Sequence, residues 1–67
     1  MSVLKVIEIL ASSPVSWEDA AKKAVEKASE TLKGVRSAYV QDQSAVVKDG
    51  KITEFRVTVK LTFEVMD

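Results

Sequence analysis

The spacing of apolar residues changes twice along the chain and predicts a strand, a helix and two further strands. Residues 3–10 form a short run rich in aliphatic and β-branched side chains, which favours a strand over a helix. Residues 17–32 carry apolar side chains every three or four positions, as on one face of a helix. Residues 35–66 alternate with a period of two, which is typical of strands with one buried face.

Capping residues mark the two ends of the expected helix. Ser16 is followed three residues later by Asp19, a near match to a capping box, so the helix is expected to start at Trp17. Gly34 is placed to end it in a left-handed conformation.

The dipeptide Asp49-Gly50 predicts a two-residue hairpin between the second and third strands. Without a bulge, this loop sets Gln43 opposite Arg56. A bulge in the second strand would instead shift the register by one residue and invert the faces of that strand. The same register predicts two further cross-strand pairs, Tyr39 with Lys60 and Ser37 with Thr62. It also predicts a row of side chains on the face that the helix covers: Ala38, Val40, Val46, Phe55, Val57, Val59, Leu61 and Phe63.

A right-handed crossover through the helix leaves room for the third strand between the first two. The expected fold class is α+β: a βαββ chain whose three-stranded antiparallel sheet wraps on one helix. The other face of the sheet is expected to be polar and uncovered.

The length of 67 residues predicts one domain, residues 1–67, which buries only about 60% of the surface of its unfolded chain. The chain has no cysteine and no histidine, so disulfides and the usual zinc sites are excluded as sources of stability. A strand over residues 53–66 would reach roughly 45 Å, too long for a lone globule of this size. We therefore expect the chain to assemble with copies of itself.

Charge and hydropathy exclude several classes of function. Ten basic and ten acidic residues are interspersed, so no basic stripe for nucleic acid is present. No apolar run approaches the ~20 residues of a membrane span, and we expect a soluble, cytoplasmic protein. Without histidine or cysteine, no nucleophile has a usual catalytic partner, so the chain is not expected to be an enzyme.

A series of short motifs follows in a characteristic order along nearly the whole chain. They are Lys5-Val6 and Glu8 in the first strand, Ser12-Ser13-Pro14, Ser16-Trp17-Glu18-Asp19-Ala20, Thr31-Leu32, Gly34-Val35-Arg36, Asp49-Gly50-Lys51 and the ending from Arg56 to Val65. Together they resemble the dodecin family. The resemblance implies a hollow homododecamer built from trimers, with flavin (riboflavin, FMN or FAD) bound in stacked pairs between subunits. It also implies storage or sequestration and not catalysis.

The resemblance places the ligand positions at Ser37 and Arg56, and both differ from the family pattern. Flavin-binding dodecins have a stacking tryptophan after the arginine of the second strand, whereas Ser37 follows Arg36 here. The family's ring-binding glutamine falls at Arg56. Loss of the stacking pair is expected to weaken flavin affinity by roughly several hundredfold. Trp17 is no substitute, because its place at the helix start favours packing in the core or an interface.

Two functional hypotheses follow from these residues. The first is a flavin-class binding and storage dodecamer with weakened flavin affinity, in which Gln43 and Tyr39 lie near Arg56 on the same sheet face. The second is a similar assembly that binds a divalent cation such as calcium, or another anion, at subunit interfaces. Arg56 is expected either to bind such an anion or to pair with a carboxylate of its own or a neighbouring subunit. The carboxylates with hard oxygen ligands for a cation are Asp42, Asp49, Glu54 and Glu64.

Overall fold

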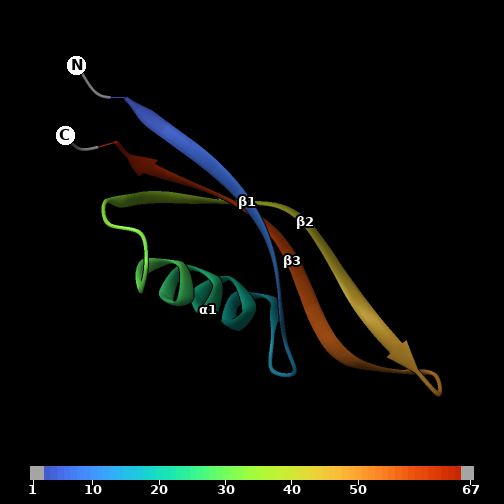
Figure 1. Cartoon of the computed structure of the whole chain (residues 1–67). Helices are drawn as coiled ribbons and strands as arrows, with labels where there is room; N and C mark the ends of the chain where they lie inside the picture. The colour runs from blue at the N-terminus through green and yellow to red at the C-terminus, as the bar shows by residue number, and fades with distance from the viewer. Residues whose placement is uncertain (1–2, 66–67) are drawn as a thin grey trace.

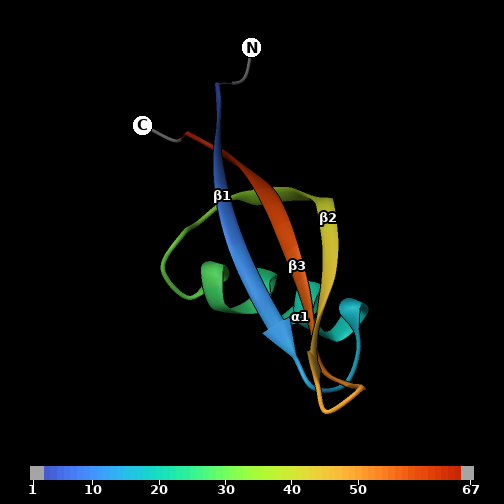
Figure 2. The same ribbon diagram turned by 90° about the vertical axis from the view of Figure 1, so that its right-hand side faces the viewer.

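A computed structural model describes residues 3–65 and has the predicted α+β, βαββ architecture. Strand β1 spans Leu4–Ser13, helix α1 spans Trp17–Ser29, strand β2 spans Val35–Lys48 and strand β3 spans Lys51–Glu64. The sheet order is β1-β3-β2, and both neighbouring pairs are antiparallel. The three strands lie side by side in this order, with α1 on one face of the sheet (Figures 1 and 2). Among the described residues, no helix is long and apolar enough to cross a membrane.

Helix α1 begins at Trp17, as the capping pattern predicted. The Ser16 hydroxyl accepts a hydrogen bond from the Asp19 backbone N–H at 2.9 Å, which satisfies one of the free donors at the helix start. The helix ends earlier than the apolar spacing indicated, at Ser29, and the Leu32 N–H then closes a turn on the Ala28 carbonyl at 2.9 Å. Gly34 follows with a φ of 78°, a backbone conformation that glycine adopts without steric cost.

The core is small because a single helix covers a single sheet. Five residues are buried in it: Ala20, Ala24, Val57, Val59 and Leu61. The two alanines let α1 lie close against the middle strand, which supplies the three larger side chains. Trp17 packs at the margin of this core, edge-on to Phe55 with ring centroids 4.9 Å apart, in line with its predicted packing role.

The β2–β3 register contains bulges that the simple hairpin prediction lacked. Lys48 faces Lys51 as expected, but a shift between Val46 and Val47 leaves Thr53 as an extra residue on β3. A second shift, between Val40 and Asp42, leaves an extra residue on β2 and restores the predicted register further along. These two shifts cancel, so the predicted pairs Tyr39–Lys60 and Ser37–Thr62 are both present. A third shift, between Val35 and Ser37, leaves Arg36 as an extra residue on β2.

Between the two bulges, the faces of β2 are inverted relative to the prediction. Gln43 lies opposite Val57 and not opposite Arg56, so its predicted place beside Arg56 was wrong. Val46 lies opposite Glu54 and leaves the helix-covered face. The physical reason is the period of two in a strand: each extra residue moves every following side chain to the other face until a second one compensates.

The molecule is elongated. Its principal extents are 50 × 20 × 13 Å, and the β2–β3 hairpin projects beyond the helix (Figure 1). Strands β2 and β3 are each 14 residues long, so much of the hairpin has no helix over it.

Candidate functional site

The sheet surface that faces away from α1 is the candidate functional site, and we call it the open face. Residues opposite each other in an antiparallel pair project to the same side, so the register assigns its members. From β1 they are Leu4, Val6, Glu8, Leu10 and Ser12; from β2, Ser37, Tyr39, Asp42, Ser44 and Val46; from β3, Glu54, Arg56, Thr58, Lys60, Thr62 and Glu64.

The open face is less polar than predicted. Leu4, Val6 and Leu10 lie along this side of β1, with Glu8 between Val6 and Leu10, and each of the three is more than half exposed. Tyr39 on β2 is 64% exposed on the same face. Exposed leucine and valine side chains in a row are typical of a surface that another molecule covers.

Ser37 is held by polar contacts within its own sheet. Its hydroxyl and the Thr62 hydroxyl share a short hydrogen bond across the β2–β3 pair. Beside it, Arg36 donates from Nε and from Nη2 to one oxygen of Glu64, at 3.2 and 2.8 Å. The position thus presents two joined hydroxyls and an ion pair, and it offers no aromatic surface. The nearest aromatic residue along β2 on this face is Tyr39, opposite Lys60.

Arg56 occupies the middle of the open face, between Ser12 of β1 and Ser44 of β2. Its Nε atom is buried and has no hydrogen-bond partner among residues 3–65. The Ser12 hydroxyl donates to Glu54 at 2.9 Å, so that carboxylate already has a partner. An unpaired buried guanidinium N–H costs on the order of 1–3 kcal/mol unless an outside group satisfies it.

Asp42 of β2 is a diagonal neighbour of Arg56 of β3 on the open face. It is exposed, it faces Thr58, and it forms no ion pair or hydrogen bond within the described part of the chain. From the sequence, Asp42 was predicted only as one of four carboxylates that could supply an oxygen ligand to a cation. Its neighbourhood with Arg56 depends on the bulge beside it, for which the sequence carries no clear signal.

The described residues of one chain form no complete metal site. Among the described residues, no three histidine, cysteine or acidic side chains come together in an arrangement that could hold an ion. Calcium prefers six to eight oxygen ligands. The carboxylates of a single copy therefore supply part of such a shell at most.

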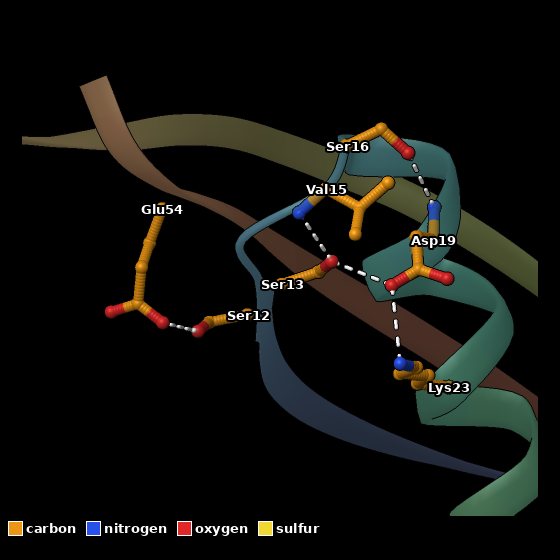
Figure 3. A network of polar contacts seen from close by, with 7 residues as sticks. All are labelled: Ser12, Ser13, Val15, Ser16, Asp19, Lys23 and Glu54. Atoms are coloured by element: carbon orange, nitrogen blue, oxygen red, sulfur yellow. Dashed lines mark hydrogen bonds and ion pairs between the residues drawn. The ribbon is translucent and has the colours of Figure 1, made fainter. Parts of the chain in front are cut away.

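A separate polar network ties the end of β1 to the start of α1 (Figure 3). The fully buried Ser13 hydroxyl donates to Asp19 at 2.6 Å and accepts from the Val15 N–H at 3.0 Å. Lys23 lies 3.4 Å from the same carboxylate. The hydrogen bond from Ser13 lowers the pKa of Asp19, partial burial opposes this, and the two lysines Lys22 and Lys23 lower it further. The network has a structural role, because its hydroxyl is closed to solvent. The sequence analysis did not predict that Ser13 takes part in this network.

Comparisons with known proteins agree with this geometry. The family model for Dodecin matches residues 3–66. A curated calcium dodecin of Mycobacterium tuberculosis is 45% identical over 65 residues, which cover 96% of this chain and 90% of the relative. A crystal structure of the M. tuberculosis calcium dodecin, described as calcium chelating, superposes with a TM-score of 0.84 at 39% identity over 97% of this chain and 93% of the other. The dodecin of Streptomyces coelicolor superposes with a TM-score of 0.94 at 27% identity over 98% and 94% of the two chains. The chain therefore belongs to the dodecin family.

Proposed function

We propose that this chain is the subunit of a homododecamer that binds and stores calcium at the contacts between its copies. The observation that carries the choice of ligand is the Ser37–Thr62 contact on the open face. It fills the position that would have to supply an aromatic platform for flavin. The extensive similarity to a calcium dodecin supports the same choice.

The surface of the single chain supports assembly. The chain exposes 5023 Å², whereas a compact monomer of 7.4 kDa exposes about 4,200 Å². Its radius of gyration is 13.7 Å, against about 11 Å for a compact 67-residue domain. The excess surface is close to the ~800 Å² that one partner contributes to a standard protein interface. Copies of the chain therefore provide the cover that the single chain lacks.

The kind of oxygen donor supports calcium over softer metals. The chain offers carboxylates and no thiolate or imidazole, and hard oxygen ligands suit calcium or magnesium. Because the described residues of one copy group too few carboxylates, symmetry-related copies would complete the shell. Binding and release in this arrangement need no catalytic group, and we infer a binding protein and not an enzyme. A cytoplasmic location stays a prediction.

Flavin, as riboflavin, FMN or FAD, is the second candidate ligand. Tyr39 favours it, because this ring is exposed on the open face two residues from Ser37. Arg56 stands where the family has a glutamine, and its N–H groups could donate to the oxygens of the flavin ring. Unlike the glutamine amide, it also carries a fixed positive charge. Without a tryptophan at Ser37, weak binding is expected.

A pair of titrations separates these ligands. Calcium added to chelator-treated protein should release or absorb heat in a saturable way, while magnesium at the same concentration should bind at least tenfold more weakly. Riboflavin or FMN fluorescence should be quenched only weakly at tens of micromolar protein. Strong quenching of flavin fluorescence, together with no heat on calcium addition, would make flavin the first candidate ligand and calcium the second. If chelation changed neither the mass nor the melting temperature and no calcium bound, the calcium function would be wrong.

A further inference from the structure

The turn between β2 and β3 holds two neighbouring groups that can react with each other. It lies at the far end of the projecting hairpin (Figure 1). Asp49 and Gly50 are both exposed there. Within residues 3–65, the Asp49 carboxylate and the Gly50 backbone N–H form no hydrogen bond or ion pair. No atom lies within 4 Å of the position that a Gly50 Cβ would take, so this side of the turn is open.

The reaction open to these groups is closure of a five-membered ring. The Gly50 nitrogen attacks Cγ of the protonated Asp49 carboxyl and forms an N–Cγ bond. The bond from Cγ to the carboxyl hydroxyl breaks, and the hydroxyl leaves as water with the amide proton. The product is a succinimide.

Water then opens the succinimide at either of its two carbonyl carbons. Addition at Cγ restores aspartate. Addition at the former backbone carbonyl gives isoaspartate, in which the main chain runs through the side chain of Asp49. One water is lost and one is gained, so the mass of the chain is unchanged.

The turn favours both requirements of this reaction, an accessible nitrogen and a movable backbone. Glycine carries no Cβ beside the attacking nitrogen. An exposed loop tip also opens locally at a much lower cost in free energy than the core. The carboxylate can therefore reach the nitrogen without unfolding of the sheet.

The other described aspartates lack this freedom. The Asp19 carboxylate accepts from Ser13 at 2.6 Å and lies 3.4 Å from Lys23, and the N–H of the next residue, Ala20, donates to the Ser16 carbonyl at 3.1 Å. Both reacting groups are thus engaged.

Asp42 lies within β2, opposite Thr58, and is followed by Gln43. The side chain of Gln43 stands beside the nitrogen that would have to attack, and the strand restricts the backbone on both sides.

We propose that Asp49 is a site of spontaneous modification, at which aspartate converts to isoaspartate through a succinimide with Gly50. The conversion needs neither calcium nor flavin and goes beyond the proposed function. It lengthens the main chain of a two-residue loop by one carbon, so it should loosen the Lys48–Lys51 pair that closes the hairpin.

Storage of the assembled full-length protein at a mildly acidic pH tests the site. Samples are digested at intervals, and electron-transfer fragmentation in a mass spectrometer separates isoaspartate from aspartate. A synthetic peptide of residues 46–53, stored beside the protein, gives the rate in an unfolded chain. In the protein, isoaspartate should form about tenfold or more faster at Asp49 than at Asp19 or Asp42.

Gly50→Ala is the matched variant. Its Cβ stands beside the attacking nitrogen, so the rate at Asp49 should fall by about tenfold, while the rates at Asp19 and Asp42 stay the same. Circular dichroism checks that the variant is folded.

Three results would overturn the inference. Asp49 could stay aspartate in the protein, whether or not the peptide converts. It could convert no faster than Asp42, or Gly50→Ala could convert as fast as the original chain. None of these results changes the calcium titration, so the proposed function is tested separately.

Discussion

The buried hydroxyl of Ser13 joins the end of β1 to the first turn of α1 by a side-chain hydrogen bond, and the described residues show no other side-chain hydrogen bond between these two elements. It closes the turn after β1 through the Val15 N–H, and it anchors α1 through Asp19 (Figure 3). Removing this buried hydroxyl leaves the Val15 N–H without its partner and takes one donor from Asp19, which keeps only Lys23. The loss exceeds the net value of a typical hydrogen bond.

Ser13→Ala should therefore lower the free energy of unfolding by about 1–3 kcal/mol per subunit. Ser12→Ala is the matched control, because this neighbouring serine is exposed and bonds a single exposed carboxylate. Its loss should cost less than about 0.5 kcal/mol. Denaturant unfolding at one fixed subunit concentration measures both, and equal losses would contradict the role of Ser13.

The lowered pKa of Asp19 predicts a stability that depends on pH in the acid range. The usual pKa is 3.8, and the folded value lies below it, chiefly because Ser13 donates to the charged carboxylate. The folded state therefore gains stability from this group above pH 3.8, and loses it as the pH falls through the folded pKa.

Asp19→Asn should weaken the dependence of the free energy of unfolding on pH in the acid range. At neutral pH the variant should be less stable than the original protein. Thermal unfolding between pH 6 and about pH 2 measures the two curves, with Glu18→Asn as a control for removing a carboxylate from the same helix turn. Parallel curves for the original protein and the Asp19 variant would contradict the assignment.

At the scale of the elements, sequence patterns predicted the strands, the helix start and the hairpin because each has a local cause. Ser16 caps the helix and Asp49-Gly50 turns the chain, and both act over a few residues. The bulge at Val46 and Val47 has no such local signal in the sequence. The prediction for Gln43 failed for this reason, while Ser37 and Tyr39, beyond both bulges, kept their predicted pairs.

The hairpin turn gives an element-scale prediction. Gly50 has a φ of 76°, and no atom lies within 4 Å of the position where a Cβ would be, so any cost of a side chain comes from the backbone alone. Gly50→Ala should lower the free energy of unfolding by about 1–2 kcal/mol.

Asp49→Asn serves as the control for the turn. Asparagine tolerates the positive φ of 53° at this position, so the stability should stay within about 0.5 kcal/mol of the original. If Gly50→Ala were as stable as the control in a denaturant titration, the left-handed turn would be absent in solution.

At the scale of the whole molecule, the single chain leaves a large part of its surface uncovered. Its excess surface, its exposed Leu4, Val6 and Leu10, and the buried Arg56 Nε, which has no hydrogen-bond partner in the described chain, are consistent with the proposed contacts with other copies. Length and strand spacing predict assembly, and this stays a prediction for the chain. The ligand could not be predicted, because symmetry brings together residues that one sequence shows only once. Ser37 and Arg56 stay predicted ligand positions, and their binding role depends on what the neighbouring copies add.

Native mass spectrometry with and without calcium tests the central claim most directly. We expect a species of about 89 kDa, twelve copies of the 7.4 kDa chain, that gains a whole number of calcium ions set by its symmetry and loses them on chelation. A monomer at micromolar concentration, or an assembly whose mass does not change when calcium is added, would contradict it.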